Sequence, residues 1–170
     1  MLWPSLCRLR LALPLLGLVA ALCNPVAHAG PFEIAISPSR FELSGRNTQR
    51  IGQSMDIQNL GGTATEVSVR TIDWTYSPEG HITYHDALLP GSCRPWVTLE
   101  RKLVRVPARG KAAFRFQVDV PVDAQRGECR FMLAVEGVEP AHKALIESGG
   151  ASLSLPVNGR IAVAVYMALN

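Results

Sequence analysis

The chain has 170 residues, of which 48% are hydrophobic, and it carries 17 basic against 14 acidic side chains. The first 29 residues hold two of the basic side chains and none of the acidic ones, so the remainder carries 15 − 14 = +1. A charge this close to zero does not favour nucleic acid or an anionic membrane surface as a partner.

The N-terminal segment has the pattern of a secretory signal peptide. Arg8 and Arg10 precede the apolar run Leu11–Leu22, and Ala27-His28-Ala29 forms a small-x-small cleavage site before Gly30. The apolar run is too short to span a bilayer comfortably. Lipidation at Cys23 is the alternative, but the bulky Leu22 stands where a small residue is expected. We therefore expect export to the periplasm, with residues 30–170 forming a single domain.

Two cysteines, Cys93 and Cys129, remain after removal of the leader. An even pair in an oxidising compartment predicts a disulfide. Neither cysteine belongs to a CxxC pair or stands beside a histidine, which disfavours redox catalysis and zinc binding.

The first half of the mature chain predicts short strands separated by turns rich in Gly, Pro and Asn. Their ranges are 32–37 with 40–43, 51–60, 65–74 and 81–85. We expect the first two ranges to form one strand interrupted by Pro38, which an edge strand tolerates.

Within the range 65–74 the apolar residues change parity. Val67 and Val69 share one parity, whereas Ile72 and Trp74 share the other. An extra residue in a strand produces such a change, so a β-bulge is predicted near Arg70 or Thr71.

The second half continues with strands at 96–99, 103–106, 114–120 and 129–135. Phe114–Val120 has the cleanest alternation of apolar and polar residues, which indicates a strand with one buried face. The following 14 residues, Gly137–Gly150, are predicted to be a long connection with one helical turn at His142–Ile146.

The final stretch, Gly149–Asn170, contains two apolar segments. Leu153, Leu155 and Val157 form an apolar row with a period of two, and Ile161–Leu169 follows after Asn158-Gly159. Two interpretations of the row are open. It is either the last core strand of the domain or a strand that offers its apolar face to a partner by β-augmentation.

Together these elements predict an all-β fold, an immunoglobulin-like antiparallel β-sandwich of about seven strands. The antibody variant is excluded, because Cys93 precedes an outer strand and no Tyr lies just before Cys129. We expect no enzymatic activity, metal or cofactor. Motifs for nucleophiles and phosphate loops are absent from the sequence, and His81 and His85 would lie roughly 13 Å apart on a strand.

The combination of segments resembles a known family. Residues 36–45, with the sequence ISPSRFELSG, are similar to the opening strand of the N-terminal domain of periplasmic pilus-assembly chaperones of chaperone–usher systems. Further matches, in the order expected, are 55–59, 114–120, the Gly127–Arg130 step and the apolar row Leu153, Leu155 and Val157.

The resemblance implies a function and a set of site residues. Such chaperones insert their final strand into a pilin-like subunit that lacks its own last strand, so Leu153, Leu155 and Val157 are expected to be the donor positions. The resemblance places Arg40 on the arginine that anchors the C-terminal carboxylate of the subunit, with Arg160 as its basic partner. An outer-membrane usher is a further partner that the resemblance implies.

The sequence departs from the family pattern in three places. The family has a second β domain, whereas this chain ends at Asn170. The basic residue that the family has in its last strand corresponds to Ala162, two residues after Arg160. Pro156 removes one backbone donor from the expected donor strand. The alternatives to a chaperone are a structural pilus or surface subunit that accepts a strand, and an enzyme or metal-binding domain.

Overall fold

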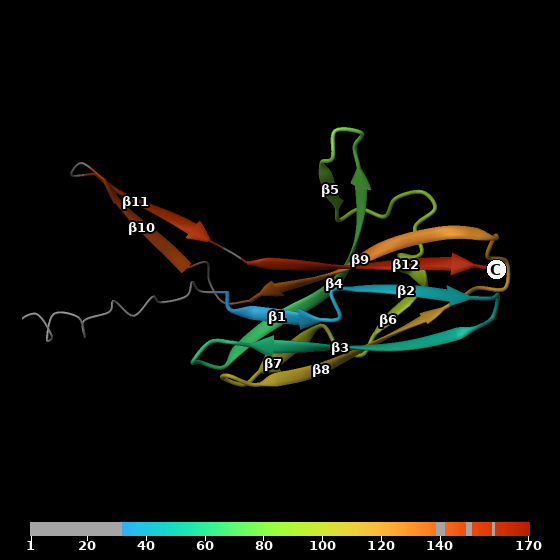
Figure 1. Cartoon of the computed structure of the whole chain (residues 1–170), viewed down its shortest axis with the longest axis horizontal. Coiled ribbons are helices and arrows are strands. Elements are labelled where there is room, and N and C mark those ends of the chain that lie inside the picture. Colours follow the sequence, from blue (N-terminus) through green and yellow to red (C-terminus); the bar gives the residue numbers. More distant parts are fainter. Residues whose placement is uncertain (1–31, 139–141, 149–150, 158) are drawn as a thin grey trace, which may run out of the picture.

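The computed structural model describes residues 32–138, 142–148, 151–157 and 159–170. The predicted signal peptide, residues 1–29, lies outside the described residues. The described part of the chain contains twelve strands and one 3-10 helix (Figure 1). They are β1 (Ile34–Ser37), β2 (Arg40–Gly45), β3 (Arg50–Asn59), β4 (Thr65–Tyr76), β5 (Ile82–His85), η1 (Arg94–Trp96), β6 (Val97–Leu99), β7 (Leu103–Val106), β8 (Lys111–Asp119), β9 (Gly127–Gly137), β10 (His142–Ser148), β11 (Ala151–Val157) and β12 (Arg160–Leu169).

Two sheets form a sandwich, and a third sheet stands apart from them. The smaller layer has the strand order β1-β3-β8-β6, and the larger one β2-β12-β9-β4-β5, with β7 also paired to β4. Every pair is antiparallel except β2 with β12. The predicted immunoglobulin-like β-sandwich is confirmed, although the described residues form more strands than the seven expected.

The residues expected to form one interrupted strand at the N-terminus form two strands in different sheets. β1 pairs with β3 of the smaller sheet, whereas β2 pairs with β12 of the larger one. The break falls at Pro38, whose missing N–H ends the ladder and lets the chain cross between layers. Each strand lies at the edge of its sheet, as predicted.

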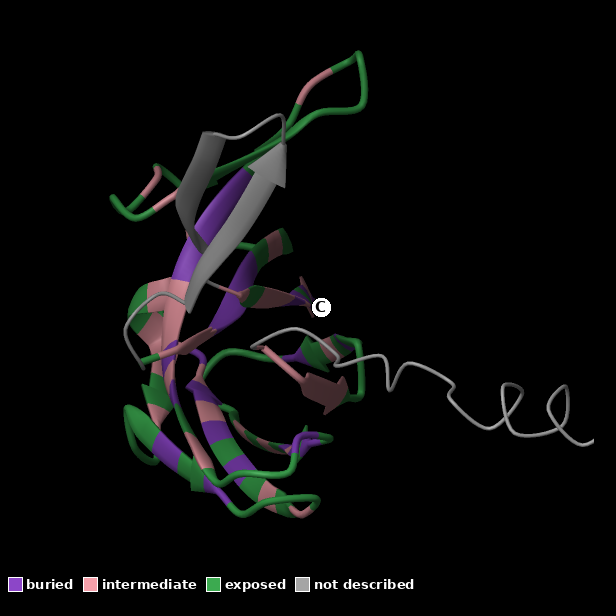
Figure 2. Ribbon diagram, turned by 90° about the vertical axis from the view of Figure 1, so that its left-hand side faces the viewer, coloured by how far each residue is buried: buried purple, intermediate pink, exposed green. Residues whose placement is uncertain are grey.

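The core between the sheets follows the predicted alternation of β8 and β9. Phe114, Phe116 and Val118 of β8 are buried and face the buried Phe131 of β9 and its inward neighbours. The Phe116 ring meets the rings of Phe41 and Phe131 edge-on, with centroids 5.1 and 6.5 Å apart. Buried residues alternate with more exposed ones along β8, whereas residues 131–135 of β9 are all buried (Figure 2). The period-two pattern therefore fixes which face of each strand enters the core.

The predicted bulge in β4 is wrong. Its pairing with β9 runs without interruption from Val67 opposite Gly137 to Ile72 opposite Met132. Ile72 and Trp74 therefore lie on the outer face of the larger sheet, where they form a second apolar cluster with Met132 and Ala134. The change of parity marks a strand that is apolar on both faces over part of its length.

The final stretch of the chain divides into two elements with different roles. β12 lies between β2 and β9, and its inward row Val163, Val165 and Met167 is buried. β11 pairs instead with β10 in a separate two-stranded sheet, which Figure 1 shows beyond one end of the sandwich. The role of last core strand thus belongs to β12.

The helical turn predicted at His142–Ile146 is wrong. These residues lie in β10, and all seven residues of β10 are in register with β11. A single helical turn is unfavourable on its own, whereas a neighbouring strand supplies a full ladder of backbone hydrogen bonds. Gly149–Gly150, between the two strands in the sequence, lies outside the described residues.

The predicted disulfide between Cys93 and Cys129 is confirmed, with Cα atoms 5.9 Å apart. Cys93 is fully buried and immediately precedes η1, from which the chain enters the smaller sheet, while Cys129 belongs to β9 of the larger sheet. The bond therefore ties the two layers together near one end of the sandwich.

Removing the disulfide should destabilise the fold. The bond closes a loop of 36 residues, so the double variant Cys93→Ala, Cys129→Ala should lose roughly 3–4 kcal/mol of unfolding free energy in the chain-entropy model. Urea unfolding of the oxidised protein and of the variant measures the difference. Equal midpoints for the two proteins would contradict this expectation.

Candidate partner-binding site

The donor positions predicted from the sequence lie in β11. Leu153, Leu155 and Val157 occupy alternate positions of this strand, opposite residues 146, 144 and 142 of β10. β10 is the single ladder partner that β11 has among the described strands. The other edge of β11 therefore carries backbone donors and acceptors that the described strands do not pair.

The two strands of this hairpin differ in composition. β10 contains Lys143 and Glu147, whereas β11 contains no charged residue. Charge and proline are the usual means of protecting an edge from pairing with another chain. In β11 the single such residue is Pro156, opposite Lys143.

Arg40, the predicted anchor, is the first residue of β2 and lies opposite Ala164 of β12. Its guanidinium forms an ion pair of 2.9 Å with Glu42, and both side chains are about two-thirds exposed. Exposed pairs of this kind contribute little to stability, so a competing carboxylate can displace Glu42 at small cost.

Arg160, the predicted partner of Arg40, begins β12 and lies opposite Glu136 of β9. Its guanidinium forms an ion pair with Glu136, which also accepts a hydrogen bond of 3.0 Å from Arg70. Arg160 lies four residues before Ala164, the residue of β12 opposite Arg40, and this separation is roughly 13 Å along the strand. The structure therefore gives each predicted anchor its own acidic partner and does not bring the two arginines together.

Arg70 links two carboxylates on the outer face of the larger sheet. It forms ion pairs with Asp86, in the loop after β5, and with Glu136. The hydrogen bonds that Arg70 donates to Asp86 and then to Glu136 raise the pKa of Arg70, and the bond to Asp86 holds the pKa of that carboxyl below its ordinary value. This network fastens the loop after β5 to the sheet.

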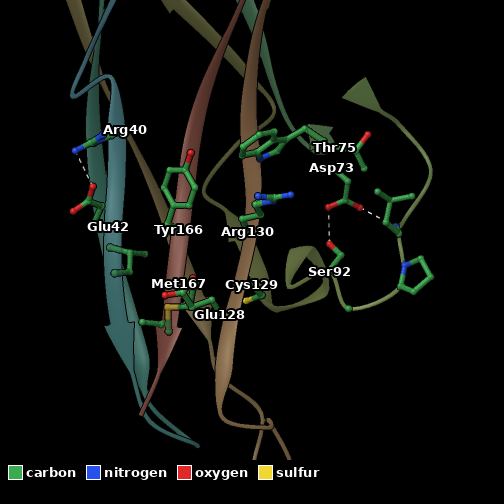
Figure 3. A pocket seen from close by; sticks show the side chains of 16 residues that line it. Arg40, Glu42, Asp73, Thr75, Ser92, Glu128, Cys129, Arg130, Tyr166 and Met167 are labelled. Atoms are coloured by element: carbon green, nitrogen blue, oxygen red, sulfur yellow. Dashed lines mark hydrogen bonds and ion pairs between the residues drawn. The ribbon is translucent and has the colours of Figure 1, made fainter. Parts of the chain in front are cut away.

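A cleft of about 750 Å³ lies on the same face of the larger sheet (Figure 3). Its floor contains Trp74 of β4, Arg130 of β9 and Tyr166 of β12. The Arg130 guanidinium carbon is 4.3 Å from the centroid of the Trp74 ring, and Tyr166 meets that ring edge-on at 6.2 Å. Arg40 and Glu42 line the end of the cleft at the edge strand β2.

The opposite wall of the cleft is the loop 89–92, which the carboxylate of Asp73 holds in place. Asp73 accepts hydrogen bonds from the Leu89 backbone N–H at 2.9 Å and the Ser92 hydroxyl at 2.7 Å, and it forms an ion pair with Arg94 at 3.2 Å. Its side chain is 3% exposed. A buried carboxylate satisfied in this way fixes the conformation of the loop.

Sequence reasoning did not find this cleft. The alternation of apolar and polar residues does not mark Trp74 or Arg130 as site residues, and no sequence pattern pairs Asp73 with residues of a loop that follows it. The single available signal was the parity change at Ile72, which places Trp74 on the outer face together with Arg130 and Tyr166. The structure shows that this parity change places the side chains of Ile72 and Trp74 on the outer face of the larger sheet.

Two further observations on the described residues concern metal binding and membrane-spanning helices. No group of three or more His, Cys, Asp or Glu side chains is arranged there to hold a metal ion. No helix in the same ranges has the length and apolar character needed to cross a bilayer.

Comparison with known proteins identifies the fold and not the family. No protein-family profile and no curated protein matches the sequence. Among solved structures, the chain is similar to the Salmonella enterica SafA pilin–SafB chaperone complex, with a TM-score of 0.52 and 12% identity over 84% of this chain and 57% of that one. It is also similar to the E. coli chaperone DraB, with a TM-score of 0.51 and 13% identity over 81% of this chain and 56% of that one.

A third similar structure is the PapD-like domain 7 of human CEP192, with a TM-score of 0.51 and 9% identity over 88% of this chain and 93% of that one. The chain thus spans a little over half the length of the pilus chaperones and nearly all of the CEP192 domain. It has the PapD-like immunoglobulin sandwich fold. That fold serves more than one biological role, so the function has to be argued from the site.

Replacing Asp73 should release the loop that forms the cleft wall. Asp73→Ala leaves Arg94, whose side chain is 16% exposed, without its carboxylate, and the unfolding free energy should fall by about 3–5 kcal/mol. Urea unfolding measures the loss, with Asp123→Ala as an exposed acidic control. A change no larger than that of the control would show that the wall does not depend on Asp73.

Acid should loosen the loop after β5 only at low pH. The folded-state pKa of Asp86 is lowered by Arg70, so the stabilisation is present above the unfolded pKa and is lost as the pH falls through the folded one. An NMR titration of the Asp86 carboxyl should give a midpoint below its ordinary value, and Arg70→Gln should move that midpoint upward. An unchanged midpoint in Arg70→Gln would assign the shift to another cause.

Proposed function

We propose that this protein is a periplasmic chaperone-like protein that binds pilus or fimbrial subunits by donating a β-strand. The observation that carries the proposal is the position of β11. This strand pairs with β10 outside both layers of the sandwich, and β12 occupies the place of the last core strand. The apolar row of β11 is therefore not required to close the domain.

The chemistry of donation follows from the strand itself. A subunit that lacks one strand exposes a hydrophobic groove flanked by two unpaired edges, and an uncharged strand can pair with either edge. Burying Leu153, Leu155 and Val157 in such a groove contributes on the order of 5 kcal/mol before ordering losses. Pro156 has no N–H, so the paired strand has one donor fewer.

The comparisons support the same class. The SafB chaperone was solved in complex with the SafA pilin, and CsuC of Acinetobacter baumannii in a complex with CsuE, which is a tip subunit. The predicted signal peptide provides the route to the periplasm. On this proposal residues 30–170 form one binding domain, which acts without catalysis.

The proposal predicts that a charge on the apolar face of β11 prevents binding of a subunit, whereas the same charge on the opposite face does not. The tagged protein is expressed in its natural host, recovered from the periplasm, and its co-purifying proteins are identified by mass spectrometry. Wild type should retain a β-rich pilin-like subunit, and Leu155→Arg should lose it by about tenfold or more, because the charge enters the hydrophobic groove.

Ser154→Arg is the matched control, since it introduces the same charge at the adjacent position of opposite parity. It should retain the subunit, and circular dichroism should give the same melting profile for both variants. Retention by Leu155→Arg equal to that of wild type would end the strand-donation proposal. Polymerisation of the purified protein on its own would instead support a structural subunit.

A further inference from the structure

The end of β4 and the whole of β5 form a hairpin that projects from the larger sheet (Figure 1). This hairpin, residues 73–85, is here called the arm. The ladder between β4 and β9 ends at Ile72, and from Asp73 to Tyr76 the described ladder partner of β4 is β5. β5 pairs with no other described strand, so the arm is a two-stranded ribbon with a free edge at β5. A ribbon of two strands is marginally stable in water, and further strands stabilise it.

One face of the arm is apolar and exposed. Tyr76 lies directly opposite Ile82, and Trp74 opposite Tyr84, so these four side chains share a face. Tyr76, Ile82 and Tyr84 are 59%, 45% and 45% exposed. β5 contains no Lys, Arg, Asp or Glu. It therefore lacks the charges that usually protect an edge strand from pairing with another chain.

The free edge of β5 presents the backbone groups of Ile82 and Tyr84. Ser77 donates its N–H to the carbonyl of His81 at 2.9 Å, and hydrogen-bonded pairs of this kind alternate with non-hydrogen-bonded ones along an antiparallel ladder. Thr83, two residues after His81, therefore bonds to β4, whereas the N–H and C=O groups of Ile82 and Tyr84 point away from β4. The edge thus offers two donors and two acceptors, placed symmetrically about Thr83.

A second copy of the same edge matches this pattern when Thr83 lies on a two-fold axis. Antiparallel pairing then sets Ile82 of each copy opposite Tyr84 of the other, and each of these two pairs exchanges two hydrogen bonds. Directly opposite residues share a face, so the isoleucine and the tyrosine also pack together, which is a favourable cross-strand combination. All outward backbone groups of both strands are paired in this register.

The neighbouring registers fit less well. With the two-fold axis at Ile82, the ladder would have to include Gly80, whose φ of 90° is not that of a strand. With the axis at Tyr84, it would have to include Asp86, which lies outside β5 and forms an ion pair with Arg70. The backbone of the arm therefore selects the register centred on Thr83.

The other free edges of the described sandwich are less suited to a second copy. β2 contains Arg40 and Glu42, β7 contains Arg105, and β6 has three residues. β1 is uncharged, but its Ile34 and Ile36 already pack against the core. Pairing at β1 would therefore cover no large exposed apolar side chain, whereas pairing at β5 covers two in each copy.

We propose that the arm is a self-association site, at which the β5 edges of two copies of this chain pair antiparallel about a two-fold axis at Thr83. The product is a four-stranded sheet in the order β4-β5-β5-β4, with the apolar faces of both arms on one side. The interface is small, so the dimer is weak, with a dissociation constant on the order of 100 µM. Self-association uses no residue of β11 and does not depend on the proposed function.

Sedimentation velocity measures the association directly. The protein is recovered from the periplasm and studied between roughly 10 µM and 1 mM, where a monomer–dimer equilibrium is expected. Tyr84→Pro removes one outward N–H from each copy and leaves the ladder between β4 and β5 intact, so it should weaken the dimer by at least about tenfold. Tyr84→Ala keeps the N–H, controls for loss of the side chain and should weaken the dimer less.

A disulfide between two copies identifies the register. Thr83 and its equivalent form a non-hydrogen-bonded pair with Cα atoms about 4.5 Å apart, within reach of a disulfide. Thr83→Cys should therefore form a covalent dimer under mild oxidation, and Cys93 and Cys129 do not compete because they are bonded to each other. Thr75→Cys places the same thiol opposite Thr83 on β4, roughly 14 Å from its equivalent, and should remain monomeric.

The outcomes separate this site from the other edges of the molecule. A wild-type protein that stays monomeric at roughly 1 mM would overturn the proposal, and so would a dimer that Tyr84→Pro leaves unchanged. Covalent dimerisation of Ala35→Cys at least equal to that of Thr83→Cys would assign the contact to β1 instead. Leu155→Arg should dimerise as wild type does, and loss of the dimer in that variant would assign it to β11. A monomeric wild type whose co-purifying protein is lost in Tyr84→Pro would assign the edge to a different chain.

Discussion

The inward row of β12 is the constraint on which the rest of the structure depends. Val163, Val165 and Met167 are fully enclosed between the layers, and β12 joins the edge strand β2 to β9. Side chains buried this completely hold the register firmly, because a shift by one residue would turn the whole apolar row outward. With the sandwich closed by β12, the preceding apolar strand β11 is available for another purpose.

The larger sheet has a second constraint, because its outer face is also partly apolar. Met132 and Ala134 of β9 are buried on that face against Ile72 and Trp74 of β4. Trp74 both covers this cluster and carries the Arg130 guanidinium. The same ring therefore connects packing to the chemistry of the cleft, and loss of Trp74 would affect the stability of the sheet as well as the position of the cation.

The sequence predicted the fold well, since period-two alternation and turn residues indicate strands directly, as in Phe114–Val120.

Prediction from the sequence was wrong where one local pattern has two physical explanations. The parity change at Ile72 is compatible with a bulge or with a strand apolar on both faces, and only the neighbouring strand β9 decides between them. Asp73 and Arg94 are 21 residues apart in the sequence, and no local periodicity predicts such a contact. The donor positions proposed on the hairpin could be suggested from the sequence because their alternation is local.

The two strands of the hairpin differ in charge, and this difference indicates which edge of the hairpin pairs with a partner strand in the proposed function. An uncharged edge strand tends to pair with any strand it meets, so proteins protect such edges with charge. Here β10 contains Lys143 and Glu147, while β11 has Pro156 alone. A partner strand that approaches the hairpin therefore meets a protected edge at β10 and a receptive one at β11. Because β10 pairs with one edge of β11, a partner strand can pair with the other edge without displacing β10. The hairpin then keeps its register while the partner covers Leu153, Leu155 and Val157.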